Sequence, residues 1–257
     1  MKFHVAALHL VCSILVCFNS AAATSLQLSS SVLKIKKSGF PESDVVLSDC
    51  QDSKGDLRHA ARKWDGAMVV LHGSGGAGSL KDLAQMLSVS TCKHRLRLAV
   101  PAAPTRNRNW PFETSQGERQ DEYLLELIKK DIPAAWQAPP ATIVTNLFIV
   151  GISAGATFLM GDFYPRHAHQ FKGRALALCG GAWPSQDKIV GIKKLDADFP
   201  LFVQIGTSDF LFEQVRAGLT KYSKMGLPLQ ASFTDAPGHC AFDFNAAVDA
   251  VMKVGSK

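Results

Sequence analysis

Ser153 lies in the motif Gly151-Ile152-Ser153-Ala154-Gly155, between an apolar run and a helix-like stretch. A serine at such a strand-to-helix junction, with glycine two residues away on each side, is typical of a strained turn that lifts a nucleophilic hydroxyl out of a sheet. The glycines suit this turn because a Cβ would clash with neighbouring backbone. By itself the motif is weak, since an ordinary strand–helix turn also accommodates two glycines. Its position after a strand favours a nucleophile.

A serine hydroxyl needs a base to take its proton, usually a histidine that a carboxylate orients. Asp209 follows one expected strand and His239 follows the next, whereas the other histidines after position 23 all precede Asp209. In enzymes with a nucleophile turn of this type, the residues occur in the order serine, acid, histidine. We therefore predict Ser153, Asp209 and His239 as catalytic residues. Asp235, at the end of the last strand, and Asp243 remain competitors for the role of Asp209.

Backbone amides beside Ser153 are expected to bind the charge that develops on an attacked carbonyl oxygen. The amide of Ala154 is one expected donor to this oxyanion hole. The second is the amide of Ser74, in the glycine-rich loop that follows the first clear strand. His72, in the same loop, is expected to brace the backbone and not to transfer protons.

The same loop also fits a rival motif. Gly73, Gly75 and Gly78 satisfy the spacing G-x-G-x-x-G of a dinucleotide-binding turn. That motif requires an acidic residue at the end of the next strand, where this chain has Pro101-Ala102. We therefore expect no nucleotide cofactor. The cysteines lack the C-x-x-C spacing of a zinc site, so no metal is expected either.

The elements that must position these residues alternate between strand-like and helix-like segments. Apolar strands are expected at 67–71, 96–100, 147–150, 174–178, 201–205 and 229–234, and helices at 79–89, 120–132, 154–164, 211–224 and 241–253. This alternation predicts an α/β fold with a mostly parallel sheet flanked by helices on both faces. Segments 32–35 and 44–47 are candidates for antiparallel strands at the edge. The carboxyl ends of the parallel strands, where ligands bind, would bring the candidate residues together.

The composition is that of one folded domain, which we place at 24–257. Hydrophobic residues make up 47% of the 257 residues and charged residues 19%, which is too few charges for a disordered chain. The net charge is +6, but no basic run is interleaved with aromatic residues. A nucleic-acid partner is therefore not expected.

The first 23 residues have the pattern of a secretory signal peptide. Lys2 precedes an apolar run over 5–18, and the small residues Ala21-Ala22-Ala23 provide a cleavage site. The run is shorter than the ~20 residues of a membrane-spanning helix, although an uncleaved anchor remains the alternative. We expect a secreted or extracytoplasmic protein without stable membrane insertion after cleavage.

Four cysteines remain after this segment: Cys50, Cys92, Cys179 and Cys240. In an oxidising compartment they predict two disulfides, with three possible pairings, and four buried thiols are the alternative. Cys179 and Cys240 follow strands at the expected catalytic edge, where a bond would hold the His239 loop. Cys50 and Cys92 precede strands, on the opposite side. We therefore expect the pairs Cys50–Cys92 and Cys179–Cys240.

These motifs together resemble those of a known superfamily. They are, in chain order, Leu71-His72-Gly73, the G-x-S-x-G turn, Gly206–Asp209 and Gly238-His239. In this order they resemble the α/β-hydrolase superfamily, and most of all its compact esterases: the polyhydroxybutyrate-depolymerase/feruloyl-esterase-like group and the phospholipase/carboxylesterase group. Ala156 departs from the first group, which usually has a second glycine there. The resemblance covers roughly residues 67–251 and implies hydrolysis through an acyl-enzyme on Ser153.

The expected substrate is a small-molecule or polymeric ester. The segment 180–199 is too short for a large lid, so we expect an open site. Trp110, Phe112 and Trp183 are expected to line an apolar substrate pocket, with packing within the loops as the alternative. A peptidase or other acyl hydrolase with the same residues, and a non-catalytic binding protein on the same fold, remain open. The sequence does not indicate an oligomeric state.

Overall fold

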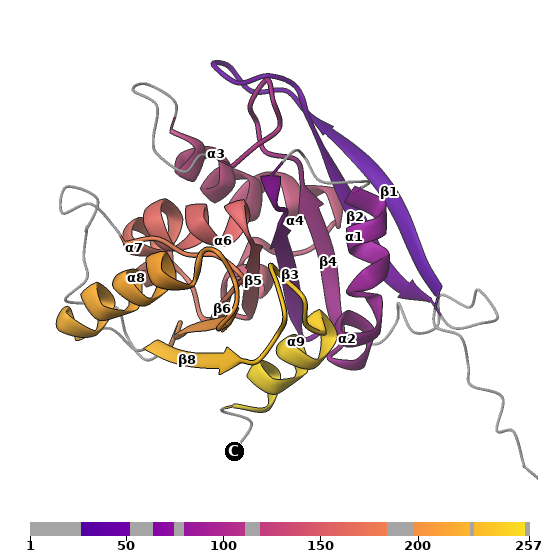
Figure 1. Ribbon diagram of the computed structural model, residues 1–257. Helices are drawn as coiled ribbons and strands as arrows, with labels where there is room; N and C mark the ends of the chain where they lie inside the picture. The colour runs from indigo at the N-terminus through magenta and orange to yellow at the C-terminus, as the bar shows by residue number, and fades with distance from the viewer. Residues whose placement is uncertain are drawn as a thin grey trace, which may run out of the picture.

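A sheet of eight described strands forms the centre of the computed structural model (Figure 1). The structure describes residues 27–51, 64–74, 80–110, 119–183, 198–226 and 229–254, so the expected signal peptide and Phe112 lie outside the described residues. The strands are β1 Gln27–Ile35, β2 Ser43–Gln51, β3 Gly66–Leu71, β4 Leu96–Pro101, β5 Leu147–Ile152, β6 Gly173–Leu178, β7 Leu201–Gly206 and β8 Leu229–Thr234. Their order in the sheet is β1-β2-β4-β3-β5-β6-β7-β8.

Six of these strands are parallel, as the sequence predicted. The pairs β4–β3, β3–β5, β5–β6, β6–β7 and β7–β8 are all parallel. The pairs β1–β2 and β2–β4 are antiparallel and lie at one edge. The expected edge strands are therefore present, although both are longer than predicted.

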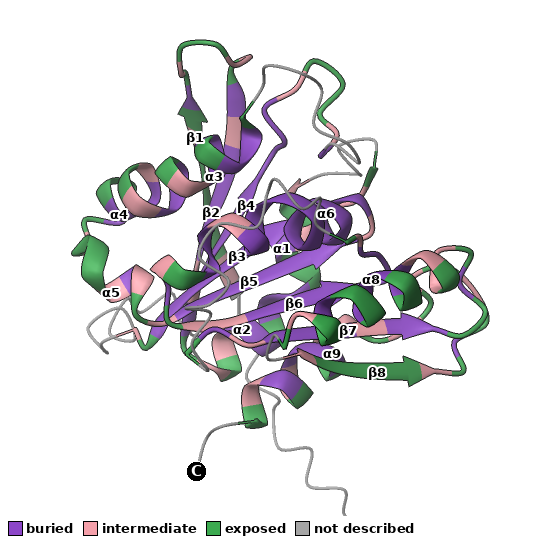
Figure 2. Ribbon diagram, turned by 90° about the vertical axis from the view of Figure 1, so that its left-hand side faces the viewer, coloured by how far each residue is buried: buried purple, intermediate pink, exposed green. Residues whose placement is uncertain are grey.

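The strands at the centre of the sheet are apolar because both of their faces are covered. Every residue of β3 and of β5 is buried, which explains why GAMVVL and LFIVGI show no alternation of polar and apolar residues. β8, with the sequence LQASFT, alternates between apolar and polar residues and is mostly exposed (Figure 2). It forms the far edge of the sheet, beyond the centre of the core.

Helices cover both faces of the sheet (Figure 1). They are α1 Leu80–Met86, α2 Ser88–Lys93, α3 Gln120–Glu126, α4 Ile132–Ala135, α5 Pro140–Val144, α6 Ala154–Phe158, α7 Tyr164–His167, α8 Phe212–Lys224 and α9 Phe244–Lys253. On one face α1, α2 and α9 pack over a cluster that includes Met68 and Val70. On the other face the helices from α3 to α8 cover a larger cluster that includes Val69 and Leu71. Neighbouring residues of β3 therefore point to opposite cores, as the pleat of a strand requires.

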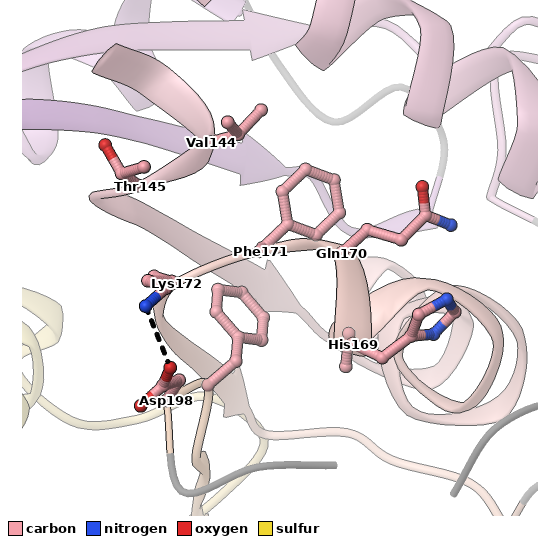
Figure 3. Close-up of a pocket in the computed structure, with 9 residues that line it drawn as sticks. Val144, Thr145, His169, Gln170, Phe171, Lys172 and Asp198 are labelled. Carbon is pink, nitrogen blue, oxygen red and sulfur yellow. Dashed lines mark ion pairs between the residues drawn. The ribbon is translucent and has the colours of Figure 1, made fainter. Parts of the chain in front are cut away.

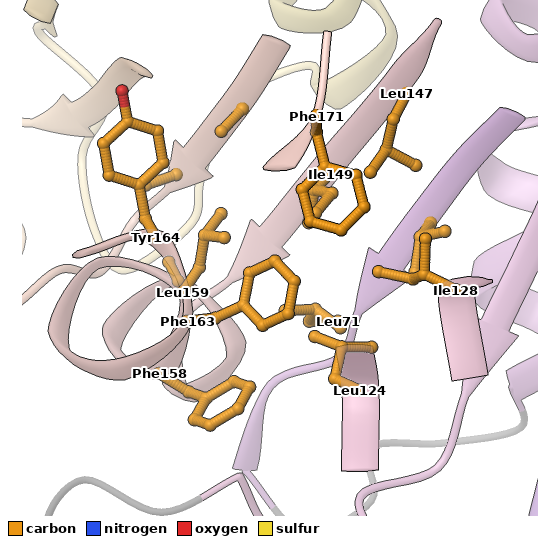
Figure 4. Close-up of a cluster of buried hydrophobic side chains, with 14 of the residues drawn as sticks. Leu71, Leu124, Ile128, Leu147, Ile149, Phe158, Leu159, Phe163, Tyr164 and Phe171 are labelled. Atoms are coloured by element: carbon orange, nitrogen blue, oxygen red, sulfur yellow. The ribbon is translucent and has the colours of Figure 1, made fainter. Parts of the chain in front are cut away.

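The larger core is rich in aromatic side chains (Figure 4). Phe158 and Phe163 point from the helices that follow Ser153 toward the sheet, and Phe171 joins them from the loop before β6. The rings of Phe163 and Phe171 lie 6.0 Å apart in a stacked arrangement. Burying side chains of this size stabilises the fold by about 1.5–3 kcal/mol each, so the helix behind Ser153 is firmly held.

Two expected helices contain a widened turn. A π-helical segment over Leu127–Asp131 separates α3 from α4, and another over Leu159–Phe163 separates α6 from α7. In both places a proline follows two residues after the widened turn, Pro133 in α4 and Pro165 in α7. Proline has no N–H and its ring clashes with the carbonyl four residues earlier. We attribute both π-turns to this clash, which the wider turn relieves without ending the helix.

Other element boundaries differ from the prediction. The expected helix 79–89 ends at Met86, and a second short helix, α2, follows it. The last helix begins at Phe244 and not at residue 241, because the carboxylate of Asp243 accepts hydrogen bonds from the amides of Asn245 and Ala246. Such an aspartate cap stabilises a helix start. The short helix α5 was not predicted. None of the described helices has the length and apolar character needed to cross a bilayer.

Candidate active site

Ser153 occupies a tight turn between β5 and α6. Its φ of 52° and ψ of −112° are strained for a residue with a side chain, and its amide donates to the carbonyl of Leu178 at 2.9 Å. A Cβ on Gly151 would lie 2.7 Å from Cα of Ala156, and one on Gly155 would clash with the carbonyl oxygen of Leu71. The two glycines of the motif are therefore required by packing against neighbouring backbone.

His239 lies between Ser153 and Asp209. Its Nε2 is 2.9 Å from Oγ of Ser153, and its Nδ1 is 2.9 Å from each carboxylate oxygen of Asp209. An ionised carboxylate can only accept, so Nδ1 carries the proton and Nε2 is free to accept from the serine hydroxyl. The structure thus brings together the three side chains that the sequence singled out, from turns after β5, β7 and β8.

Asp209 is held as a buried acceptor. Its side chain is fully buried, whereas that of His239 is 29% exposed. The amide of Leu211 donates to Oδ1 at 2.9 Å, and the amide of Cys240 donates to Oδ2 at 3.4 Å. The two competing acids are placed elsewhere: Asp235 is exposed, and Asp243 caps α9.

The residues expected to supply the oxyanion donors lie in the loop after β3 and at the start of α6. Gly73 approaches it so closely that an added Cβ would lie 3.4 Å from Cβ of Ser153. Ser74 follows in this loop and is exposed. Ala154 is the first residue of α6, and an amide at that position has no carbonyl partner within its own helix.

His72 links the loop after β3 to the loop after β4. Its Nε2 accepts from the amide of Ala103 at 3.0 Å, and its Nδ1 donates to the carbonyl of Gly73 at 2.7 Å. Burial lowers the pKa of His72, which keeps the ring in the neutral form that these bonds require. The bracing role expected for His72 is confirmed by these contacts.

The cysteines pair as expected. Cys50 joins Cys92, and Cys179 joins Cys240, with Cα–Cα distances of 5.5 and 5.1 Å. Cys179 follows β6 and Cys240 follows His239, so the second disulfide ties the histidine loop to the strand beside Ser153. Both cysteines of this pair have a positive φ, 45° and 56°. The sulfur atoms lie near His239, but because they are bonded to each other they are not thiolate ligands for a metal.

Of the three aromatic residues expected to line a substrate pocket, the structure describes Trp110 and Trp183. Trp110 is fully buried, stacked on Phe158 at 4.8 Å and 5.9 Å from the ring of His72, so it belongs to the core. The prediction that Trp110 lines the substrate pocket is wrong for this structure, because the large core under the site takes up its indole ring. Trp183 is 43% exposed, and Lys221 lies over its ring at 4.3 Å.

Two residues at the site were missed by the sequence analysis. Phe210 is 77% exposed, and its ring centre lies 4.5 Å from that of His239. Gly180 packs against Ser153 so closely that a Cβ there would clash with the serine carbonyl. Both positions directly follow residues that the analysis had singled out, Asp209 and Cys179. Their place at the ends of strands was the signal that could have found them.

A second histidine–carboxylate pair lies away from this site. The buried Asp121 accepts from Nε2 of His167 at 2.9 Å and from Arg166 at 3.0 Å. Burial opposes its ionisation, but bonds from His167 and Arg119 outweigh this and lower the pKa of Asp121. The second ring nitrogen of His167 contacts Gln170, so the pair joins α3 to α7. The described hydrogen bonds of the pair include no nucleophilic side chain.

A surface pocket of about 200 Å³ lies at the opposite edge of the sheet (Figure 3). Phe171 and Phe199 line it, and Lys172 pairs with Asp198 at 3.2 Å across its mouth. These residues precede β6 and β7, whereas the Ser153–His239–Asp209 contacts lie where the strands end. The pocket is therefore separate from the candidate site.

The sheet order, the turn at Ser153 and the placement of Asp209 and His239 define an α/β-hydrolase fold. No protein-family model matches the sequence, and neither does any curated protein. The structure is similar to that of a ferulic acid esterase, with a TM-score of 0.62, 13% identity, and coverage of 88% of this chain and 97% of the other. It is also similar to S-formylglutathione hydrolase FrmB from Staphylococcus aureus, with a TM-score of 0.58, 14% identity, and coverage of 88% and 96%.

A third similar structure comes from work on two fungal esterases from Rhizomucor miehei. Its TM-score is 0.63 at 13% identity, and the match covers 88% of this chain and 83% of the other. Identities this low establish a shared fold. The activity of this chain has to be argued from its own residues.

Proposed function

We propose that this protein is a serine hydrolase that cleaves carboxylic esters. The observation that carries the proposal is the chain of hydrogen bonds from Asp209 through His239 to Ser153, each 2.9 Å long. A hydroxyl, a neutral imidazole and a buried carboxylate in this arrangement are the requirements for activating a serine. The names of the similar structures, esterases and hydrolases, agree with this reaction.

In the first step, Oγ of Ser153 bonds to the ester carbonyl carbon while its proton moves to Nε2 of His239. The amides of Ala154 and Ser74 bind the oxyanion. The bond to the alcohol oxygen then breaks, and Nε2 returns the proton to that oxygen. Water next gives a proton to Nε2 and bonds to the acyl carbon. The bond to Oγ breaks, Oγ regains the proton, and the acid is released.

The surroundings of the site favour esters that need no interfacial activation. His239 is partly exposed, and Phe210 stands free beside it, so a substrate would reach the site from solvent. The proposed partner is a small or polymeric ester. The two disulfides and the pattern of residues 1–23 support secretion, which we include in the proposal.

A fluorophosphonate probe together with a panel of esters and peptides tests this function. We expect the folded protein to be labelled on Ser153, to hydrolyse short-chain esters, and to leave peptides uncut. Ser153→Ala should lose both labelling and hydrolysis, because no other group can form the acyl-enzyme. A folded wild-type protein that is neither labelled nor active would indicate a non-catalytic binding protein. Faster cleavage of peptides than of esters would indicate a peptidase.

A matched pair of substitutions tests the acid. Asp209→Asn should lower kcat by about 10⁴-fold, because an amide no longer holds His239 in the tautomer that accepts from Ser153. Asp235→Asn removes the same charge from an exposed site and should leave kcat within about twofold, as expected for a surface substitution. Equal losses in the two variants, measured on one ester, would contradict the assignment of Asp209.

A further inference from the structure

Phe210 is the most exposed of the large hydrophobic side chains that the structure describes. It is 77% exposed, compared with 50% for Phe233 and 43% for Trp183. The other two rings have partners of their own, since Phe233 packs edge-on against Phe212 and Trp183 lies under Lys221. The described ring contact of Phe210 is with His239.

The backbone around Phe210 is well held. The amide of Asp209 donates to the carbonyl of Gly206 at 3.1 Å, and the amide of Phe212 donates to the carbonyl of Asp209 at 2.9 Å. The amide of Leu211 donates to the carboxylate of Asp209. These bonds hold the backbone on both sides of Phe210, and the ring itself lies beside the imidazole of His239. Because the ring is 77% exposed, most of its surface remains available to a substrate bound beside His239.

The chemistry of His239 identifies which part of a substrate meets this ring. Nε2 must come within hydrogen-bond distance of the leaving oxygen, about 3 Å, to protonate it. The carbon group on that oxygen then lies beside the imidazole, and the centre of the Phe210 ring is 4.5 Å from the centre of that imidazole. The carbonyl oxygen points instead toward the amides of Ala154 and Ser74, on the side of the serine.

We infer that Phe210 is a specificity-determining residue, whose ring binds the alcohol portion of the substrate and favours esters of apolar, ring-containing alcohols. This inference rests on the proposed ester hydrolysis. It assigns to Phe210 a contact with the leaving group and no part in proton transfer. An aromatic ring of the alcohol that packs on the ring of Phe210 gains from tilted or offset stacking in addition to the exclusion of water.

The test compares benzyl acetate with methyl acetate, which share the acyl group and differ in the alcohol. Phe210→Ala should lower kcat/KM for benzyl acetate by about tenfold, the size of one lost apolar contact, and leave that for methyl acetate within about twofold. Phe233→Ala is the matched control, because it removes an exposed ring that contacts Phe212 and not His239. It should leave the ratio of the two substrates unchanged.

The outcomes separate this inference from the proposed function. Equal losses on both acetates, accompanied by a shifted pH–rate profile, would show that Phe210 only positions His239, and would overturn the inference. An unchanged ratio in Phe210→Ala would overturn it as well. If the wild type hydrolyses neither acetate and Ser153 is not labelled by the fluorophosphonate, the proposed function itself fails. Both the proposed function and the inference are supported if the wild type hydrolyses methyl acetate and Phe210→Ala lowers the ratio of kcat/KM for benzyl acetate to that for methyl acetate by about tenfold.

Discussion

Two histidines near the site show how the surroundings of a residue decide its chemistry. His239 is partly exposed, with its Nε2 facing a hydroxyl, so it is suited to transferring a proton. His72 is fully buried, with both ring nitrogens bonded to backbone groups, so it has no position free for a substrate. The same type of side chain is thus suited to act as a base at position 239, whereas at position 72 it joins two backbone segments.

The burial of His72 affects the stability of the protein at acid pH. Because the pKa of His72 is lowered from its ordinary value of 6.5 in the folded state, the unfolded chain binds the extra proton first as the pH falls. The stabilising contribution of the neutral ring is therefore complete above pH 6.5 and is lost as the pH falls from there toward the lower folded-state pKa. This dependence should be visible in the wild type and absent when the ring is removed.

Urea unfolding of the wild type and of His72→Ala at about pH 8 and about pH 5 measures this effect. At the higher pH, the variant should be less stable by about 1–3 kcal/mol, because the buried amide of Ala103 loses its acceptor. At the lower pH the difference between the two proteins should shrink. A difference that grows toward acid pH would mean that His72 is charged in the folded protein.

At the scale of elements, loops after parallel strands carry the site, and one disulfide joins two of them. Cys179 follows β6 and Cys240 lies in the loop after β8, next to the histidine. The positive φ of both residues is unfavourable for side chains other than glycine and persists only where the surroundings impose it. We expect the disulfide to be part of what holds His239 in register with Ser153.

The disulfide between Cys50 and Cys92 provides a matched control for the one between Cys179 and Cys240. The two bonds close loops of similar length, 61 and 42 residues, so each should stabilise the protein by about 4 kcal/mol in the chain-entropy description. Replacing Cys179 and Cys240 by alanine should lower both stability and kcat, the latter by about 10²-fold because the base is misplaced. The same change at Cys50 and Cys92 should lower stability alone.

Thermal unfolding, together with ester hydrolysis well below the unfolding midpoint, distinguishes these effects. Equal activity in the two double variants at a temperature where both are folded would show that the disulfide beside His239 has no positioning role. The measurement therefore tests geometry and not simply the amount of folded protein.

At the scale of the whole molecule, the described residues form one eight-stranded sheet and two disulfides. The net charge of the chain is +6. When produced in a secreting host, the protein should begin at Thr24, because cleavage is expected after Ala23. Amino-terminal sequencing of the secreted protein checks this, and alkylation without a reductant should find no free thiol. Material that keeps residues 1–23 and stays with the membrane fraction would favour the uncleaved anchor.

The strands and the turn at Ser153 could be predicted from the sequence because each depends on residues that are close together in the chain. Continuous apolar runs marked the central strands, and in a parallel sheet the residues after such runs must meet at one edge. The tight turn at Ser153 needs glycine at positions 151 and 155, so it leaves a trace in the sequence. The order of Ser153, Asp209 and His239 then left few alternatives.

Tertiary packing decided which aromatic side chains are buried, and local sequence patterns do not contain this information. Trp110 and Phe210 both follow strands as aromatic residues in polar surroundings, yet the first is fully buried and the second is 77% exposed. The difference arises because Phe158, from a distant helix, stacks on Trp110, whereas the described ring contact of Phe210 is with the partly exposed His239. The sequence thus determined the strands, the turn at Ser153 and the order of the three reactive residues. Contacts between segments far apart in the chain determined which aromatic rings are buried and which are exposed, because an apolar side chain has the same local pattern whether or not another element covers it.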